Sequence, residues 1–473
     1  MLKDNEKYNA LDFIKDDEIN SLIAKGKELV SDKELVREII EKSKSAEGLT
    51  PEETAVLLNL EDKELIEEMF KAARQVKEKL YGKRLVVFAP LYVSNYCVNN
   101  CTYCGYKHCN DELKRKKLNK EQLIEEVKVL ESLGHKRIAL EAGEDPVNAP
   151  LDYILDCIKS IYSIKFDNGS IRRINVNIAA TTVEDYKRLK DAEIGTYILF
   201  QETYHKPTYE RLHVSGPKHN YNYHTTAMHR AREAGIDDIG MGVLYGLYDY
   251  KYETLAMLMH AMDLEETTGV GPHTLSVPRI RPAENVSLEN YPYLVDDEDF
   301  KKIVAILRLA VPYAGLILST REEPGLRDEI IALGVSQVST GSCTGVGGYS
   351  ESYVDPEEKP QFEVGDHRSP VEMIESLMEA GYIPSYCTAC YREGRTGERF
   401  MEIVKSGELY KICEANALIT LKEFIDDYGT DRTREIGDKL INKSIDEIDN
   451  ESFRKSVEEK INKISKGTRD LRF

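Results

Sequence analysis

Between residues 85 and 345 the chain alternates short β-rich runs with longer amphipathic segments, and few folds accept this alternation. Amphipathic segments with helical spacing, such as residues 118–134 and 297–311, separate the runs. The runs are residues 86–93, 137–143, 173–180, 196–203, 238–246, 273–280, 315–322 and 335–342. Strands joined by helices pair in parallel, because each helix crosses back over the sheet. Eight units over about 250 residues predict an α/β fold, a (β/α)8 TIM barrel. A doubly wound open sheet is the alternative.

The two flanking regions read as helical. Residues 1–84 predict an N-terminal helical extension, in which Thr50-Pro51-Glu52-Glu53 forms a capping box with proline at the first helical position. Residues 85–345 would form the barrel. Residues 346–473 begin with a Gly/Tyr/Glu-rich connection and continue as a mostly helical C-terminal region, which we expect to bind a second metal cluster.

Composition narrows the class of function. The formal net charge is −19, which disfavours nucleic acid and anionic membranes as partners. The sequence has no long uncharged apolar run, and its first residues lack the basic start and apolar core of a signal peptide. We therefore expect a cytoplasmic protein, in which clustered cysteines indicate metal binding or catalysis more than disulfides. Of nine cysteines, six fall in two clusters.

Polar groups gather at the carboxyl ends of the predicted strands. Ala142-Gly143-Glu144 follows the second run, Arg321 ends the seventh and Ser339 lies in the eighth. In a barrel these ends converge on one mouth, where barrel enzymes have their active sites. Strand ends are also polar because they meet water, so a single such end carries little information.

The first cysteine cluster follows the first strand directly. Cys97, Cys101 and Cys104 lie within eight residues with the spacing C-x3-C-x-aromatic-C. Thiolates favour iron–sulfur clusters and zinc. Three cysteines on one loop can bind three irons of a 4Fe-4S cube, which leaves the fourth iron open to a substrate or cofactor. A zinc knuckle is the alternative, but its cysteines usually come as C-x2-C pairs.

In these residues the chain resembles the radical S-adenosylmethionine (SAM) enzymes, whose open iron holds the methionine end of SAM. The resemblance implies a set of SAM-binding positions, each weak by itself because a lone arginine or Gly-x-Gly is usually structural. It implies that Tyr103 lies against the adenine, that Ala142-Gly143-Glu144 binds the SAM amino group and that Arg230 binds the SAM carboxylate. Gly240 and Gly242 match a glycine stretch near the adenine. Alanine at position 142 departs from the usual glycine.

Further motifs resemble the aromatic amino-acid lyases of this superfamily: residues 271–283, 201–205 and 319–322. These lyases include the tyrosine lyase of thiamin thiazole synthesis and its relative in FeFe-hydrogenase maturation. The resemblance implies cleavage of the tyrosine Cα–Cβ bond to dehydroglycine and p-cresol. Arg321 is our candidate to hold the substrate carboxylate, with help from Ser339. Alternatively, Arg321 forms a rim ion pair with Glu322 or Glu323, which would be worth little.

The second cluster, Cys387, Cys390 and Cys413, resembles the C-terminal signature of the hydrogenase-maturation lyase, which the thiazole enzyme lacks. A Cys3His zinc site is disfavoured, because no histidine follows His367. We expect a second, auxiliary iron–sulfur cluster with an open corner. The resemblance implies that it holds an extra iron, which collects CO and cyanide with free cysteine as carrier ligand. His273 is the candidate anchor of this iron; the alternative is a histidine hydrogen-bonded inside the barrel mouth.

The resemblance also implies partners: tyrosine as substrate, free cysteine, other hydrogenase-maturation proteins and an electron donor. Since dehydroglycine must travel between two clusters at opposite ends of the barrel, we expect an enclosed, water-poor channel. One alternative is a tyrosine lyase that supplies thiazole synthesis. A second is a non-catalytic iron–sulfur scaffold, which would have no need of Glu144, Arg230 and Arg321 around the mouth. Cys109 and Cys343 have no assigned role, and Cys157 is expected in the core.

Overall fold

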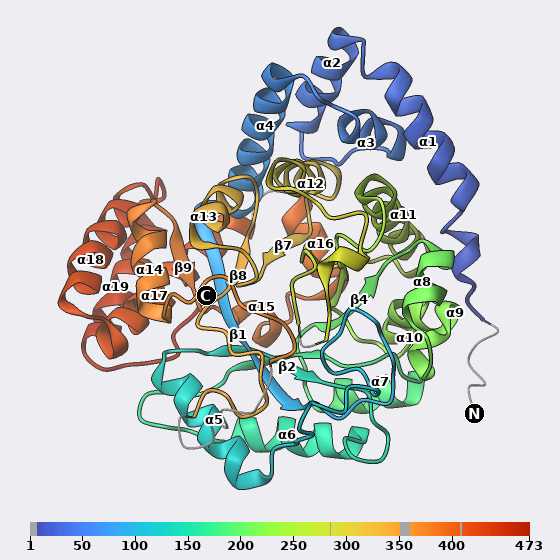
Figure 1. The fold of residues 1–473 in the computed structure, drawn as a ribbon. Helices are drawn as coiled ribbons and strands as arrows, with labels where there is room; N and C mark the ends of the chain where they lie inside the picture. Colours follow the sequence, from blue (N-terminus) through green and yellow to red (C-terminus); the bar gives the residue numbers. More distant parts are fainter. Residues whose placement is uncertain (1–6, 284, 351–359, 407–408) are drawn as a thin grey trace.

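A closed parallel barrel forms the centre of the computed structural model, which describes residues 7–283, 285–350, 360–406 and 409–473. The strand order is β2-β3-β4-β5-β6-β7-β8-β1, and β1 also pairs with β2, which closes the barrel (Figure 1). The strands are β1 (Arg84–Ser94), β2 (Arg137–Ala142), β3 (Arg173–Asn177), β4 (Tyr197–Glu202), β5 (Ile239–Val243), β6 (Thr274–Ser276), β7 (Gly315–Leu318) and β8 (Gln337–Ser339). The first predicted run, residues 86–93, lies within β1, and each of the other seven contains one strand. The barrel is therefore confirmed and the open sheet is wrong.

Helices cover the outside of the barrel, as the amphipathic segments predicted. They are α5 (Lys120–Ser132), α6 (Leu151–Ser163), α7 (Val183–Asp191), α8 (Lys206–Leu212), α9 (Tyr221–Thr225), α10 (Ala227–Glu233), α11 (Tyr250–Thr268), α12 (Asp297–Ala310) and α13 (Pro324–Ala332). Short 3₁₀ turns lie at η2 (Ala10–Asp12), η3 (Pro217–His219) and η4 (Leu288–Asn290). Cys157 on α6 is buried in the core, as expected.

The N-terminal helices form one group beside the barrel (Figure 1). They are α1 (Asp16–Leu29), α2 (Lys33–Ser43), α3 (Pro51–Leu58) and α4 (Lys63–Tyr81). The predicted capping box is present: the Thr50 hydroxyl accepts from the Glu53 backbone, and the Glu53 carboxylate accepts from the Thr50 backbone. Helices α3 and α4 pack on α12, and α3 also packs on α11, which joins the extension to the barrel.

The C-terminal region joins the barrel at the amino end of β1. Its strand β9 (Ile383–Ser385) pairs in parallel with β1, at Arg84–Ile383 and Val86–Ser385. Its helices are α14 (Pro370–Glu379), α15 (Ala389–Arg392), α16 (Gly397–Lys405), α17 (Leu409–Tyr428), α18 (Asp431–Asp446) and α19 (Glu451–Ser465). Since α17 packs on β9 and on α4, this region contacts both the barrel and the N-terminal helices.

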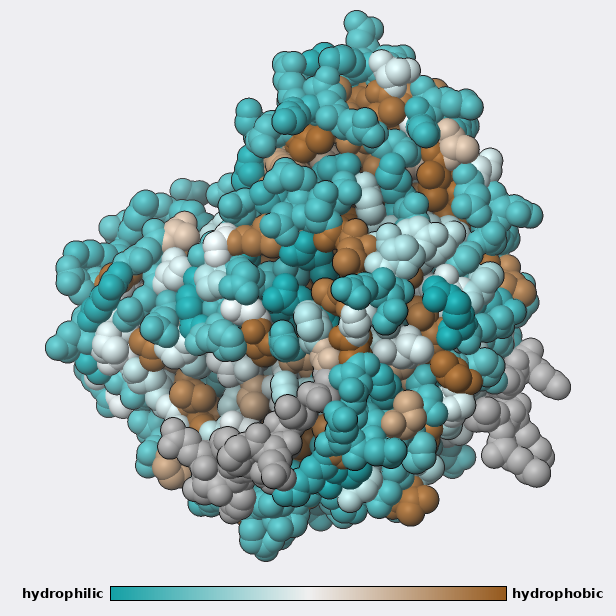
Figure 2. All heavy atoms as spheres, in the orientation of Figure 1, coloured by the Kyte–Doolittle hydropathy of each residue, from teal (hydrophilic) through white to brown (hydrophobic). Residues whose placement is uncertain are grey.

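The molecular surface is mainly hydrophilic on the face drawn in Figure 2, with separate small hydrophobic areas. This agrees with the 31% of charged residues in the sequence. Among the described helices, none combines the length and the apolar composition that a membrane crossing requires.

Candidate active site

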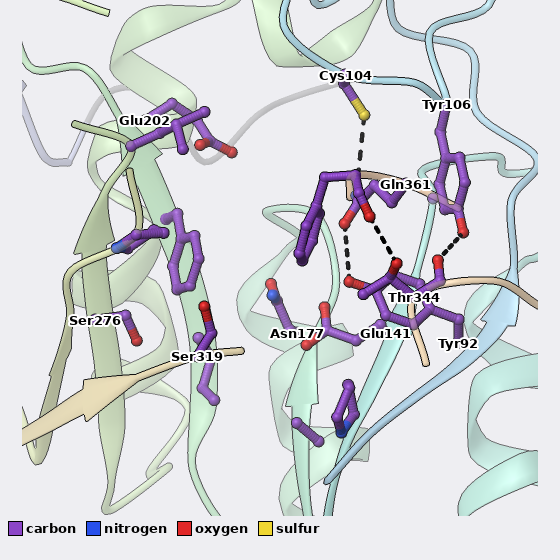
Figure 3. Close-up of a pocket in the computed structure, with 18 of the residues that line it drawn as sticks. Tyr92, Cys104, Tyr106, Glu141, Asn177, Glu202, Ser276, Ser319, Thr344 and Gln361 are labelled. Atoms are coloured by element: carbon purple, nitrogen blue, oxygen red, sulfur yellow. Dashed lines mark hydrogen bonds between the residues drawn. The ribbon is translucent and has the colours of Figure 1, made fainter. Parts of the chain in front are cut away.

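A cavity of about 230 Å³ lies at the carboxyl ends of the barrel strands (Figure 3). Its wall contains most of the residues that the sequence proposed for this mouth: Cys97, Cys101, Tyr103, Cys104, Ala142, Gly143, Glu144, Arg321 and Ser339. Seven of the eight strands contribute residues to this wall, and β5 contributes through Leu244, which directly follows it. The convergence of polar strand ends on one mouth is therefore confirmed.

The cysteine loop lies directly against the end of β2. The backbone N–H of Val98 donates to the Glu144 carbonyl at 2.8 Å, and the N–H of Gly143 donates to the Ser94 carbonyl at 3.0 Å. A Cβ atom on Gly143 would lie 2.3 Å from the Tyr96 carbonyl oxygen, so only glycine permits this approach. Arg115 donates to the carbonyls of Tyr106 and Lys107 just beyond the third cysteine. The loop is thus fixed by backbone contacts on both sides.

The electrostatics of the three thiols suit the binding of positively charged iron. Burial raises the pKa of Cys101, and the neighbouring thiols Cys104 and Cys97 add to the shift while Lys218 opposes it. Burial and Cys97 also raise the pKa of Cys104, to about 11. Three thiolates would therefore repel each other in this buried place until positive charge is supplied, and bound iron supplies it. In the described part of the chain, no group of three or more His, Cys, Asp or Glu side chains has an arrangement that could hold a single metal ion.

Tyr103 lies on the cysteine loop after β1, and Glu144 lies in the segment that follows β2. The Tyr103 hydroxyl is 2.7 Å from Nε2 of His213, and its ring meets that imidazole edge-on. Glu144 accepts a hydrogen bond of 2.5 Å from Asn99 on the cysteine loop, and burial raises its pKa. Both side chains line the cavity, and their contacts with SAM stay a prediction.

Three predicted SAM-site residues do not line the cavity. Arg230 is buried in α10, and its guanidinium donates to the Thr181 and Tyr223 carbonyls and to the Thr226 hydroxyl. Its N–H groups thus have protein partners, and none of these contacts supports a role in SAM binding. Gly240 and Gly242 lie on β5. A Cβ on Gly242 would be 2.8 Å from the Phe200 ring, which does line the cavity.

Arg321 lies in the cavity wall without a carboxylate partner among the described residues. The expected competitor Glu322 pairs with Arg279 instead, through a bidentate contact. The Arg321 guanidinium stacks on the ring of Phe362, 3.3 Å from the ring centroid. Burial lowers the pKa of Arg321, as it does for a cation withdrawn from water. The rim ion pair considered for Arg321 is therefore not formed.

Sequence reasoning missed several groups in this wall. Lys218 donates to Glu202 at 2.8 Å, and this pair lies beside the cysteine loop. Glu141 lies beside Asn177 in the close-up (Figure 3) and accepts a hydrogen bond from it. The signal for Glu141 was present: with Arg137 it is one of two charged residues in an otherwise apolar run, and it lies at an inward position of the strand.

The segment of residues 360–368 crosses the cavity wall and was also missed. Gln361 accepts from the Tyr92 hydroxyl at 2.8 Å, and its amide lies 3.9 Å from Sγ of Cys104 (Figure 3). Phe362 is the ring beneath Arg321. The segment of residues 360–368 follows β7 by about 40 residues, and it reaches the cavity only through tertiary packing. Local sequence patterns carry no information on such packing.

A second, smaller cavity of about 30 Å³ holds the other cysteine set. Cys387, Cys390 and Cys413 line it together with His273, which the sequence had proposed as their companion. Burial lowers the pKa of His273, so its imidazole is neutral and free to bind a metal. The ring packs 4.3 Å from that of Phe400, measured between centroids.

Two arginines complete the second cavity. Arg84 and Arg137 line it, and Nη2 of Arg137 donates to the Cys387 carbonyl at 3.0 Å. The hydrogen bond from Cys413 is the largest cause that lowers the pKa of Cys390, and the guanidiniums of Arg84 and Arg395 lower it further. This donor set of three thiols, one neutral imidazole and adjacent cations fits an anionic iron–sulfur cluster with an additional ligand.

The two cavities lie at opposite ends of one barrel, and the same strands line both. On β1, Arg84 and Val86 face the second cavity whereas Phe88, Pro90 and Tyr92 face the first. Adjacent inward positions of a strand are about 7 Å apart. The remaining cysteines stay outside both sets: Cys109 is exposed, and Cys343 lies beside the first cavity without lining it.

Comparison with known proteins agrees with this geometry. Residues 91–262 match the radical SAM superfamily, and residues 276–383 match the Biotin and Thiamin Synthesis associated domain. A crystal structure of HydG, a maturase of the [FeFe]-hydrogenase, is 60% identical and superposes with a TM-score of 0.95, covering 98% of this chain and 100% of that one. HydG from Carboxydothermus hydrogenoformans is 41% identical with a TM-score of 0.81, covering 94% and 99%. The 2-iminoacetate synthase of Escherichia coli is 29% identical over 76% of this chain and 93% of its own.

Proposed function

Because the chain belongs to the HydG family of radical SAM lyases, we propose that it cleaves tyrosine at the Cα–Cβ bond and converts one product into CO and cyanide. The products of cleavage are p-cresol and dehydroglycine, and the diatomic ligands serve assembly of the FeFe-hydrogenase active-site cluster. One observation carries the proposal: two three-cysteine sets lie at opposite ends of one barrel and share its strands. A lyase that only releases dehydroglycine has no need of the second set.

At the first cavity the chain holds the cluster and the substrate. Cys97, Cys101 and Cys104 would bind a 4Fe-4S cluster, which supplies the electron that cleaves SAM and so generates the radical. The Glu144 carboxylate, which lines this cavity, would accept a hydrogen bond from the SAM amino group. Gly143 keeps it there, because the close approach of β2 fixes the Glu144 carbonyl to the cysteine loop.

Arg321 would hold the carboxylate of the amino acid. A buried guanidinium without an anionic partner is costly, and a bidentate carboxylate relieves that cost. Phe362 holds the guanidinium plane by stacking, so the fork is oriented before the substrate arrives. Ser339 lines the same wall and would add a hydrogen bond. The Arg279–Glu322 pair supports this role. Arg279 binds the Glu322 carboxylate, which would otherwise pair with Arg321 in place of the substrate.

At the second cavity, Cys387, Cys390 and Cys413 would hold an auxiliary iron–sulfur cluster. His273 would bind an extra iron through its neutral imidazole, and free cysteine would serve as a further ligand. Arg84 and Arg137 offset the negative charge of thiolates and cyanide there. Product passing between the cavities would leave the first one past Phe88 and Ala139, whose apolar side chains would exclude water from it.

Anaerobic turnover of the cluster-reconstituted protein with SAM, reductant and tyrosine tests the proposal, with p-cresol and trapped CO assayed together. Cys97→Ala should abolish p-cresol, whereas Cys390→Ala and His273→Ala should retain p-cresol and lose CO. Cys109→Ala is the matched control, because that thiol is exposed and outside both sets. Cresol without CO in the fully loaded wild type would favour a lyase that supplies dehydroglycine to thiazole synthesis. Absence of both products would refute tyrosine as substrate.

A further inference from the structure

Three carboxylates are among the residues that line the first cavity, and they differ in their partners. Glu202 is paired with Lys218 at 2.8 Å. Glu144 accepts from Asn99 beside the cysteine loop. Glu141 accepts only from Asn177 among the described side chains, and the nearest cation that acts on it is Arg321. Glu141 is therefore the carboxylate of this wall that neither the cysteine loop nor a lysine engages.

Strand register fixes the place of Glu141. It lies opposite Tyr92 of β1 and opposite Asn177 of β3, so these three side chains form one layer of the barrel interior. All three line the cavity, and Figure 3 shows them grouped together. The Tyr92 hydroxyl already donates to Gln361, which leaves the Glu141 carboxyl facing the cavity.

An amino acid bound by Arg321 brings a second charge into this space. Its carboxylate and ammonium are joined to one carbon atom, so the ammonium must lie within a few ångströms of the guanidinium. Burying an ammonium without an anionic partner is strongly unfavourable. Arg281 and Lys218 cannot receive it, because they are cations. Glu202 and Glu322 also act on Arg321, but they are already paired with Lys218 and Arg279. Glu141, on which Arg321 also acts, has no such cationic pair.

We propose that Glu141 binds the α-ammonium of the amino-acid substrate, with Asn177 beside it, and accepts one of its protons before the radical reaction. The inference rests on the proposed function, since it needs an amino acid held by Arg321. One N–H bond of the ammonium breaks and one O–H bond forms on the Glu141 carboxylate. Both groups become neutral, and neither is oxidised or reduced.

The surroundings suit this transfer. Burial raises the pKa of Glu141 to about 8, although Asn177 and Arg321 oppose the shift. Tyr92, the other titratable group in this layer, has its pKa raised well above 10 by burial and stays neutral. A peptide α-amino group has a pKa of roughly 8, and the ammonium of a free amino acid is a somewhat weaker acid because its own carboxylate stabilises the charge. Raising the pKa of Glu141 therefore brings the acceptor closer to the donor. Transfer replaces two buried charges by two neutral groups and leaves a neutral amine for hydrogen abstraction.

A ligand pair isolates the contact: tyrosine, and 3-(4-hydroxyphenyl)propanoate, which lacks only the amino group. We expect the wild type to bind tyrosine more tightly, and Glu141→Gln to reduce tyrosine binding by about 10- to 100-fold, as for a lost hydrogen bond between charged groups. Binding of the propanoate should change less than about threefold, because its contact with Arg321 persists. Equal losses for both ligands, or none, would overturn the proposal.

The pH profile gives a second readout. For the wild type, kcat/KM for p-cresol formation should rise as Glu141 loses its proton near pH 8. Glu141→Gln should lose this rise, and Glu141→Asp should keep it with a lower rate, because a carboxylate remains. A rise that persists unchanged in Glu141→Gln would refute proton acceptance by this residue.

Glu253→Gln is the matched control. Burial also raises the pKa of Glu253 to about 8, but this carboxylate accepts from Thr203 and from the Tyr204 backbone and does not line the cavity. It should leave the ratio of the two affinities unchanged. If the wild type itself binds no tyrosine and forms no p-cresol, the proposed function fails and this inference falls with it. If the wild type is active and Glu141→Gln matches it, the inference alone fails.

Discussion

The replacement of Asp366 by asparagine should release the segment of residues 360–368 from the barrel mouth. Asp366 and Arg327 form an ion pair of 2.6 Å in which both side chains are 1% exposed. Asp366 also accepts three hydrogen bonds from the side chain of Arg368 and one from its backbone. Burial opposes ionisation, but Arg368 and Arg327 hold the pKa of Asp366 below 3.8, so the carboxylate is charged at every neutral pH.

The magnitude follows from what the asparagine leaves behind. Arg327 would remain buried with its charge and would keep only neutral oxygen partners, the Ser339 carbonyl and the new amide oxygen. Removing one partner of a buried ion pair costs about 3–5 kcal/mol. The backbone bonds that hold the segment, such as Gly365 N–H to the Thr320 carbonyl at 2.9 Å, would then be the main restraint. Opening of the segment should become roughly 100- to 1000-fold more frequent.

Hydrogen–deuterium exchange measures this opening at the amides of Gly365 and Asp366, both of which donate to the Thr320 carbonyl. Their protection should fall by that factor, and the KM for tyrosine should rise because Phe362 leaves Arg321. Asp328→Asn is the control. Its ion pair with Arg368 is 45% exposed on the aspartate side, so its loss should cost at most about 1 kcal/mol. Unchanged protection in the Asp366 variant would show that the backbone bonds alone hold the segment.

Three further outcomes are expected. Gly143→Ala should impair cluster loading at Cys97, Cys101 and Cys104, measured as iron per chain, because its Cβ would lie 2.3 Å from the Tyr96 carbonyl. Arg230→Met should lower the free energy of unfolding by about 2–4 kcal/mol through lost hydrogen bonds, while SAM affinity measured by equilibrium binding stays unchanged; a selective loss of SAM binding would restore the role predicted from sequence. Burial lowers the pKa of Lys77 from 10.5 to about 7, so the unfolded chain binds more protons between these values. Stability in denaturant titrations should therefore rise with pH there, by at most about 1.4 kcal/mol per pH unit, and Lys77→Met should flatten the rise.

The barrel was predictable because its signal is local and repeated. Each run of β-branched and aromatic residues had a helix after it, and parallel pairing with crossovers leaves few topologies. The strand ends were less well predicted: the run that begins at His273 contains only three strand residues, β6 (Thr274–Ser276). Regular pairing ends there, although Tyr245 and Arg279 form an isolated parallel bridge further along the chain, and the Arg279 side chain pairs with Glu322. Such tertiary contacts override local propensity.

The cysteine sets were predictable for a different reason: their chemistry restricts the residue types, and their spacing restricts the loop. The partners of Arg230 were not predictable, since they come from three separate backbone and side-chain oxygens that only the packed structure brings together. The same is true of Gln361 and Phe362, whose positions depend on the buried Arg327–Asp366 pair. A local sequence pattern identifies a polar side chain, but it does not determine whether that side chain bonds to other protein groups or lines the cavity.

Strand parity offers a way to recover part of what was missed. In a closed barrel, alternate residues of each strand face the interior. A charged residue inside an apolar run is therefore buried if it lies an even number of positions from a residue that faces inward. On β2 the inward residues are Arg137, Ala139 and Glu141, which places a cation at one end of the barrel and a carboxylate at the other. Burying each charge is unfavourable unless a ligand or an opposite charge compensates it. One strand therefore contributes to both ends of the barrel: Arg137 lines the cavity of the second cysteine set, and Glu141 lines the cavity in which we propose that it binds the substrate ammonium.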